Sequence, residues 1–185
     1  ENLSIIDASI DPDNKKWARV KQVRKIVQDT IKEKGYKNVF NIKELTIYAS
    51  AIVDYSDQYD VSVSLILAIT TVESAFNPNS ISIAKAKGLM QLMDETAKEC
   101  ANDINKPFYN VFKVKDNVQL GTWYLWKMLD IFNGDIDLAI LAYNCGPSCV
   151  KRVQSGEYNR YPSETVDYLK KVNEWKVKYE ALDGS

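Results

Sequence analysis

Apolar residues recur at steps of three and four positions along most of the chain, the spacing that places them on one face of an α-helix. Only seven glycines and five prolines interrupt this pattern, and no segment shows the alternation typical of a strand. The pattern therefore predicts an all-α protein. The predicted helices run from residues 11–14 to about residue 35, then over residues 42–59, 62–76, 117–132, 135–143 and 163–182, and a short helix opens at residue 94.

The first and third predicted helices differ in their apolar patterns. The first carries one apolar stripe, formed by Trp17, Val20, Val23, Val27 and Ile31. The third, residues 62–76, is apolar on most faces, as a helix at the centre of a core is, and Asn77-Pro78 should end it. Residues 79–87 have no clear period, which predicts irregular backbone. We expect residues 1–45 to form a helical extension that packs on a domain of residues 46–185.

Charge and hydropathy limit the partners that this chain can have. It contains 24 basic and 25 acidic residues, so no overall field attracts it to nucleic acid or to an anionic membrane surface. No apolar run is long enough to span a bilayer, so we expect no tight membrane insertion by this segment. We also expect the protein to be a monomer. Because the chain begins at Glu1 rather than Met, we expect an upstream signal or anchor to have been removed.

The absence of histidine narrows the chemistry further. It excludes Ser–His and Cys–His nucleophile pairs and the commonest metal ligand, so acid–base chemistry must use carboxylates, Tyr, Lys or Cys. The three cysteines lack paired ligand spacing, and no glycine-rich phosphate loop follows a strand, so we expect no metal and no cofactor. If the chain is exported, one disulfide is possible, with Cys145 and Cys149 the nearest pair. Reduced, packed thiols are the alternative.

Glu73 is the main candidate for chemistry. It lies in the last turn of the apolar third helix, where burial and the negative end of the helix dipole both disfavour its charged form. The pKa of its carboxyl should therefore be raised. A carboxylic acid that keeps its proton near neutral pH can protonate a departing glycosidic oxygen. A single Glu on an apolar helix is more often an edge residue, or one satisfied by a backbone amide.

Four short motifs around Glu73 follow one another in a fixed order. They are Glu-Ser-Ala-Phe-Asn-Pro at 73–78 with Ser82, Gly-Leu-Met-Gln-Leu-Met at 88–93, Ala-Tyr-Asn-Cys-Gly-Pro at 142–147, and Glu164-Thr165 with Tyr168. In order and spacing they resemble the catalytic core of the soluble lytic transglycosylases, over residues 65–172. The resemblance implies a goose-lysozyme-like, all-α domain with a long groove for the glycan strands of peptidoglycan.

The same resemblance implies roles for individual residues. Glu73 would act first as acid and then as base. The implied substrate-binding residues are Ser82, Gly88, Gln91, Met93, Tyr143, Asn144, Glu164 and Tyr168. Ser82 would bind the sugar or its acetamido group, and Gly88 would let backbone approach the ligand. Tyr143 and Asn144 would face Glu73 from the opposite wall, whereas Glu164 could instead cap the last helix.

Some positions depart from the family or fall outside its motifs. Ile83 and Lys85 stand where the family prefers Pro and Gly, so the loop before Gly88 should differ in shape. One aromatic residue of the group 123–126 should meet solvent or a groove, because neighbouring helical positions face different ways. Tyr158 and Tyr161 flank a loop that could contact glycan or peptide.

The glycan strand can be cut by hydrolysis or by intramolecular transfer, and a single acid is enough for the transfer. No Asp or Glu lies between residues 74 and 93 to serve as the second carboxylate of an ordinary glycosidase. If the acetamido group of the substrate stabilises the cationic centre, the muramic 6-hydroxyl can attack instead of water and leave a 1,6-anhydro end. Together with the resemblance, this implies a lytic transglycosylase that cleaves the MurNAc-GlcNAc bond outside the cytoplasm. A hydrolytic muramidase using Asp94, Glu95 or Glu164 and a non-catalytic binding or adaptor module are the alternatives.

Overall fold

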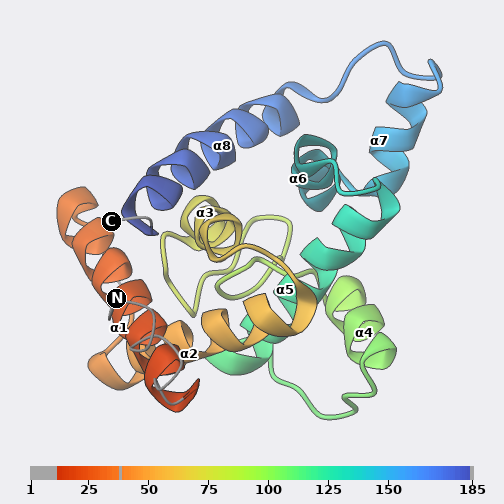
Figure 1. The fold of residues 1–185 in the computed structure, drawn as a ribbon. Helices are drawn as coiled ribbons and strands as arrows, with labels where there is room; N and C mark the ends of the chain where they lie inside the picture. The colour runs from red at the N-terminus through yellow and green to blue at the C-terminus, as the bar shows by residue number, and fades with distance from the viewer. Residues whose placement is uncertain (1–11, 38, 184–185) are drawn as a thin grey trace, which may run out of the picture.

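The structure is a computed structural model that describes residues 12–37 and 39–183. In these ranges it contains eight helices and no strand, which confirms the predicted all-α class (Figure 1). The helices are α1 (Pro12–Lys34), α2 (Ile42–Tyr59), α3 (Val63–Ser74), α4 (Asp94–Asp103), α5 (Val114–Ile131), α6 (Ile136–Cys145), α7 (Pro147–Gln154) and α8 (Ser163–Asp183). None of those described is both long and apolar enough to cross a bilayer.

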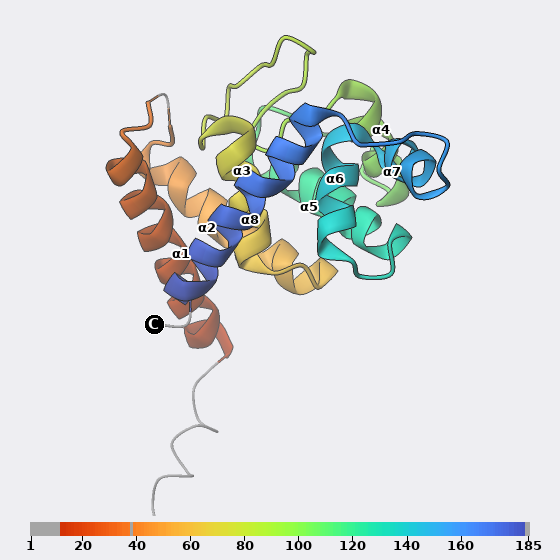
Figure 2. The ribbon, with the colours of Figure 1, turned by 90° about the horizontal axis from the view of Figure 1, so that it is seen from above.

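Helix α3 is the central helix of the core, as its all-round apolar pattern predicted. Every residue from Ser64 to Thr71 is buried, and α8 and α2 pack against it (Figures 1 and 2). The Ser62 side chain accepts a hydrogen bond from the Leu65 backbone N–H and so caps the first turn. This central position places any side chain on the last turn of α3 close to α8.

The end of α3 differs from the prediction. The helix stops at Ser74, two residues before the predicted end, because Ala75 and Phe76 adopt left-handed backbone conformations with φ of 50° and 62°. Such conformations are unfavourable for residues with a Cβ, so burial must compensate. The Phe76 ring is fully buried against Tyr36, Phe40 and Tyr48, which fixes the chain just after Glu73.

Helix α1 packs on α2 and α8 and contributes to the same core. Its buried face is Val20, Val23, Ile26, Val27 and Thr30. Trp17 was wrongly included in the predicted stripe, because its side chain is 51% exposed. The buried face of α1 begins at Val20, about two turns after the helix starts at Pro12, so Trp17 in the second turn lies before the packed surface.

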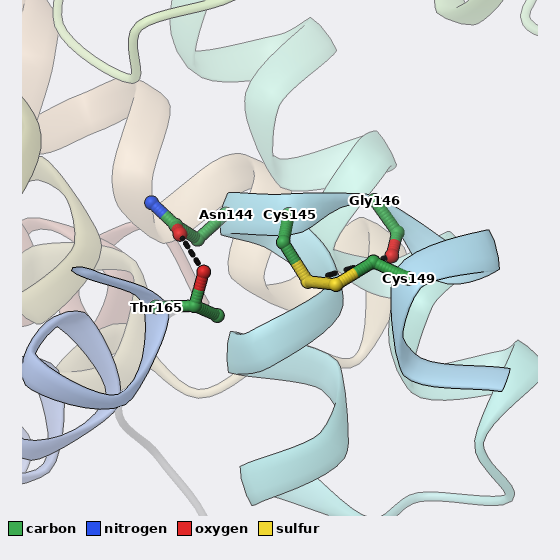
Figure 3. Close-up of a disulfide and its surroundings, with 5 residues drawn as sticks. All are labelled: Asn144, Cys145, Gly146, Cys149 and Thr165. Carbon is green, nitrogen blue, oxygen red and sulfur yellow. Dashed lines mark hydrogen bonds between the residues drawn. A yellow bond between two sulfur atoms is a disulfide. The ribbon is translucent and has the colours of Figure 1, made fainter. Parts of the chain in front are cut away.

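The C-terminal half contains one helix that was not predicted. Helix α7 follows α6 after a single residue, Gly146, in a stretch between residues 143 and 163 for which no helix was predicted. Pro147 is compatible with a helix here because it occupies the first helical position. A disulfide between Cys145 and Cys149 joins the two helices (Figure 3), and Cys100 remains a buried free thiol.

Residues 75–93 form a long connection between α3 and α4, the yellow-green loop at the top of Figure 2. The predicted irregular backbone of residues 79–87 is confirmed, with only isolated bridges from Lys87 to Ile81 and Leu92. Asn117 of α5 fixes this loop. Its Oδ1 accepts from the Met90 backbone N–H at 2.8 Å, and its Nδ2 donates to the carbonyls of Lys87 and Val111. The loop is therefore held on α5 by a buried amide.

Candidate active site

Glu73 lies in the last turn of α3, with a half-buried side chain. The hydroxyl of Tyr168, on α8, donates a hydrogen bond to its Oε1 at 2.7 Å. Burial raises the pKa of the Glu73 carboxyl to about 7, and the hydrogen bond from Tyr168 acts in the opposite direction. The raised pKa expected from the sequence is confirmed. Near neutral pH this group is present in both forms, so it can give or take a proton.

Two cavities meet at Glu73. The larger, of about 920 Å³, is bounded by the 75–93 loop, α5, α6 and the start of α8, and its lining contains most of the predicted binding residues: Ser82, Gln91, Met93, Tyr143, Asn144 and Glu164. The smaller, of about 450 Å³, lies along α8, and Tyr168 is part of its lining. Glu73, Asn144 and Glu164 belong to both linings. The carboxyl of Glu73 therefore stands at the border between a cavity on the loop side and a cavity on the α8 side.

Ser82, Gln91 and Met93 form the loop wall of the larger cavity. The Ser82 Oγ accepts from the Ala86 N–H at 3.0 Å, which leaves its hydroxyl hydrogen available to a ligand. The Gln91 Nε2 donates to the carbonyls of Ser80 and Gly88, so its amide oxygen remains the free acceptor. Met93 precedes α4, and its side chain is 38% exposed.

Tyr143 and Asn144 come from the last turn of α6 and form another wall. The Tyr143 hydroxyl donates to the Met90 carbonyl at 2.8 Å, and burial raises the pKa of this phenol well above its usual value. It therefore ties α6 to the loop as a neutral group. Asn144 is exposed, and its Oδ1 accepts from the Thr165 hydroxyl at 2.8 Å (Figure 3). Its amide N–H groups remain for the cavity.

Gly88 has a different role from the one expected. It is buried, does not contribute to the lining of either cavity and has φ of +78°. A Cβ there would lie 2.3 Å from Asn117 Nδ2 and 2.4 Å from the Val111 carbonyl oxygen. The glycine is thus required by backbone conformation and by close packing against the buried amide, rather than by approach to a ligand.

Sequence reasoning missed the roles of Asn117 and Thr165. Asn117 had been taken as the start of a helix, but α5 begins at Val114 and the side chain is buried within it. An amide on an otherwise apolar helix face was the signal, because buried amides need partners. The expectation for the aromatic group 123–126 is confirmed, since Tyr124 lines the larger cavity.

The other acids considered from the sequence occupy different environments. Both oxygens of Asp94 lie 2.7 Å from the Lys87 ammonium, and Glu95 is exposed on α4. Glu164 is in the first turn of α8, exposed, and lines both cavities. Burial is the main cause of the raised pKa of Glu73, and no second carboxylate contributes to it. In the described part of the chain, no group of His, Cys, Asp or Glu side chains could hold a metal ion.

A helical domain with a half-buried glutamic acid where two open cavities meet has the architecture of a lysozyme-like glycan-cleaving enzyme. A model of the family "Transglycosylase SLT domain" matches residues 50–166, well over half of the chain. This chain belongs to the transglycosylase SLT family. The family and the lytic transglycosylase class that the motifs indicated are thereby confirmed.

Two relatives illustrate how far the similarity extends. The chain is 33% identical over 173 residues to a membrane-bound lytic murein transglycosylase E of Buchnera aphidicola, covering 87% of this chain and 78% of that protein. It is 36% identical over 128 residues to a membrane-bound lytic murein transglycosylase C of Sodalis glossinidius, covering 61% of this chain and 35% of that protein.

Solved structures agree with the fold. The 70 kDa soluble lytic transglycosylase of Escherichia coli has a TM-score of 0.70 at 24% identity, covering 96% of this chain and 32% of that one. An inactive glutamate-to-glutamine mutant of Slt from Pseudomonas aeruginosa has a TM-score of 0.64 at 26% identity, covering 93% and 31%. The lysozyme-like fold expected from the motifs is confirmed. The chain spans about a third of the length of these solved proteins.

Proposed function

We propose that this chain cleaves the β-1,4 bond between MurNAc and GlcNAc in peptidoglycan and leaves 1,6-anhydro-MurNAc ends. The observation that carries the proposal is the Glu73 carboxyl, whose pKa of about 7 keeps a proton available at neutral pH where the two cavities meet. Murein is named as the substrate of the two relatives, and the Pseudomonas protein that is inactive carries a glutamate-to-glutamine change.

In the first step, Glu73 gives its proton to the glycosidic oxygen as the bond from that oxygen to C1 of the muramic sugar breaks. The acetamido oxygen of the same sugar stabilises the cationic C1. The Tyr168 hydroxyl occupies Oε1 of Glu73, and Oε2 has no hydrogen-bond partner among the described residues, so Oε2 is the atom that carries the proton. Tyr168 also stabilises the carboxylate that this step creates.

In the second step, the Glu73 carboxylate takes the proton of the muramic 6-hydroxyl, and O6 forms a bond to C1. The acetamido oxygen is released, and Glu73 is protonated again. No water is consumed. We propose that Ser82, Gln91 and Asn144 orient the sugars, since each has a hydrogen-bonding group left over from its contacts within the protein.

The hydrolytic alternative needs a second carboxylate about 5 to 9.5 Å from the first. Asp94 is engaged in an ion pair with Lys87, whereas Glu164 lines both Glu73 cavities and Asp167 lines the smaller one. The absence of any carboxylate contribution to the raised pKa of Glu73 supports the single-acid route. Mass spectrometry of digested peptidoglycan tests it, because anhydromuropeptides are lighter by one water than hydrolytic products. Products with reducing ends only would contradict the proposal.

A non-catalytic binding module is tested by substitution. Glu73→Gln keeps the shape of the side chain but cannot donate a carboxylic proton, so turnover should fall by at least about a thousandfold, as expected when an essential acid is lost. Glu95→Gln on α4 is the matched control and should keep full activity. If Glu73→Gln clears peptidoglycan suspensions as fast as the unmodified protein, Glu73 is not the acid.

Location and domain organisation follow from the same proposal. The cell wall lies outside the cytoplasm, so we propose that the chain acts in the periplasm or at the cell surface. The Cys145–Cys149 disulfide supports an oxidising compartment. We also propose that it acts as a monomer, with residues 1–45 as a supporting extension and residues 46–185 as the catalytic domain.

A further inference from the structure

A third cavity lies outside the site described so far. It has a volume of about 810 Å³ and is enclosed by α7, the connection 155–162 and the start of α8. We name it the α7–α8 cavity. We propose that the α7–α8 cavity binds the peptide stem attached to the glycan strand whose sugars lie beside Glu73. This inference rests on the proposed function, since it concerns the side branch of the same substrate.

The α7–α8 cavity adjoins the smaller Glu73 cavity. Ser163 and Asp167 line both, and they are one helical turn apart on α8. Tyr168, the next residue, lines the Glu73 side and bonds to the acid itself. The first turns of α8 are thus a shared wall. A side branch of a sugar bound at Glu73 would therefore reach the α7–α8 cavity by crossing Ser163 and Asp167.

The charged groups of the cavity suit a peptide better than a sugar. Arg160 and Asp167 both line it, both are exposed, and neither forms an ion pair with any residue in the described ranges. A guanidinium binds a carboxylate through two parallel hydrogen bonds, and a carboxylate binds an ammonium group. Stem peptides carry both carboxylate and amino groups. Neutral N-acetylated sugars need neither charge.

Aromatic and apolar side chains complete the cavity. Tyr158, Tyr161, Pro162, Val153 and Val166 are part of the lining. The Tyr158 ring is 43% exposed, and the Arg152 guanidinium lies 4.1 Å from its centre. These surfaces can cover the aliphatic parts of a short peptide while Arg160 and Asp167 hold its charges.

The wall that carries Arg160 is fixed to the rest of the protein before any ligand binds. The Tyr158 N–H donates to the Arg152 carbonyl at 2.9 Å, and the Arg152 Nε donates to Glu157 at 2.7 Å. Glu157, the acid nearest to Arg160 in sequence, is therefore already paired. The disulfide anchors α7 through Cys149, which also lines the cavity. A preformed site loses less entropy on binding than a mobile one.

The proposal predicts that peptide recognition can be separated from glycan cleavage. Two substrates are compared, intact peptidoglycan and glycan strands from which an amidase has removed the peptides. Arg160→Ala should raise KM for the intact substrate roughly five- to tenfold with kcat unchanged, and should leave both constants unchanged on peptide-free strands. Lys151→Ala, which removes an exposed cation of α7 outside the cavity lining, is the control. Arg160→Lys should lie between Ala and the unmodified chain.

Equal losses on both substrates would identify a glycan subsite instead and would overturn the proposal, as would no loss on either. A second measurement does not depend on catalysis. Stem peptide released by the amidase is titrated into the protein and followed by NMR, and the resonances of Tyr158 and Tyr161 should shift in the unmodified protein but not in Arg160→Ala. Absence of these shifts overturns the peptide site even if anhydro products are found. Shifts in a protein that cleaves neither substrate would contradict the proposed function alone.

Discussion

The Tyr168 hydroxyl donates a hydrogen bond of 2.7 Å to the Glu73 carboxyl across the interface between α8 and α3. The bond stabilises the charged form of the acid, while burial of Glu73 disfavours that form by more. The two effects leave the pKa of Glu73 at about 7. A group that must act as acid in one step and as base in the next works best with a pKa near the working pH. Tyr168 is therefore a positioning residue that also sets this balance.

The pH dependence of cleavage should report this balance. Because the free enzyme must hold the proton on Glu73, kcat/KM should fall as pH rises through about 7. Tyr168→Phe removes the hydrogen bond that lowers the pKa of Glu73, so the descending limb should move to higher pH by about half a unit to one unit. Initial rates of peptidoglycan clearance between pH 5 and pH 9 give the pH at which kcat/KM falls to half of its maximum.

Tyr109→Phe is the control for this experiment. It removes a hydroxyl from the connection between α4 and α5, outside the linings of both Glu73 cavities, and should leave the limb in place. A limb that stays fixed in Tyr168→Phe, or moves to lower pH, would show that Tyr168 does not tune the acid.

Stability should depend on pH through the same carboxyl. The pKa of Glu73 is about 7 in the folded protein against an ordinary value of 4.5, so between these pH values the folded state holds more protons than the unfolded state. The free energy of unfolding therefore decreases as pH rises from about 4.5 to about 7 and changes little outside that window. Glu73→Gln removes this dependence. The unfolding free energy of the variant minus that of the unmodified protein should therefore be larger at pH 8 than at pH 4, by about 2 to 3 kcal/mol.

Urea denaturation of both proteins at several pH values tests the prediction, because other titrating groups are common to the two and cancel in the difference. A difference in unfolding free energy that is the same at pH 4 and pH 8 would mean that the carboxyl is not buried as described.

The helices were predictable where their apolar pattern determines packing. The limits of α2 agree with residues 42–59, and α3 was recognised as the core helix from its apolar faces. Helix ends were less predictable because long-range contacts determine them. The end of α3 depends on the Phe76 ring among aromatic side chains from residues 36, 40 and 48, and no local pattern specifies that contact. Helix α7 was missed because a Gly-Pro pair is compatible with either a turn or a new helix start.

The sequence predicted most of the residues that lie around Glu73, but not the hydrogen bonds that hold the 75–93 loop in place. The motifs identified Glu73 and seven of the residues that line its cavities, which are Ser82, Gln91, Met93, Tyr143, Asn144, Glu164 and Tyr168. They did not reveal that Asn117 holds the 75–93 loop, because its partners are backbone groups at residues 87, 90 and 111. Every residue has a backbone carbonyl, so the sequence does not show which carbonyls a side chain binds. For the same reason Gly88 was assigned to ligand approach rather than to packing against Asn117.

Removal of the Asn117 amide should disturb the loop and the fold together. Asn117→Ala leaves the Met90 N–H and the carbonyls of Lys87 and Val111 without their buried partner, which should cost about 2 to 4 kcal/mol of unfolding free energy. Gly88→Ala should have an effect of similar size, because its Cβ would clash with Asn117 at 2.3 Å. Thermal and urea unfolding measure both. Gln119→Ala, half-buried on the same helix, should cost less than about 1 kcal/mol, and a comparable loss there would remove the special role of Asn117.

Asn144 and the Cys145–Cys149 disulfide are neighbours at the junction of α6 and α7 (Figure 3). Asn144 lines both Glu73 cavities, and Cys149 lines the α7–α8 cavity. Gly146, the only residue between the two helices, has φ of +86° and by itself imposes little restraint on their angle. The disulfide is therefore the covalent restraint that fixes the α7–α8 cavity relative to the Glu73 cavities.

Loss of the disulfide should lower stability by a modest and calculable amount. The bond closes a loop of only a few residues, and chain-entropy arguments give about 2 kcal/mol for a loop of this size. Cys145→Ala/Cys149→Ala should therefore unfold about 2 kcal/mol more easily than the oxidised protein, and its KM for intact peptidoglycan should rise severalfold because α7 no longer holds Arg160 in place. Reductant should reproduce both effects in the unmodified protein and have none on the double variant, which serves as the control. Unchanged urea midpoints in a sample whose mass shows two added hydrogens would mean that helix packing alone fixes α7, and the disulfide would then have no structural role at the site.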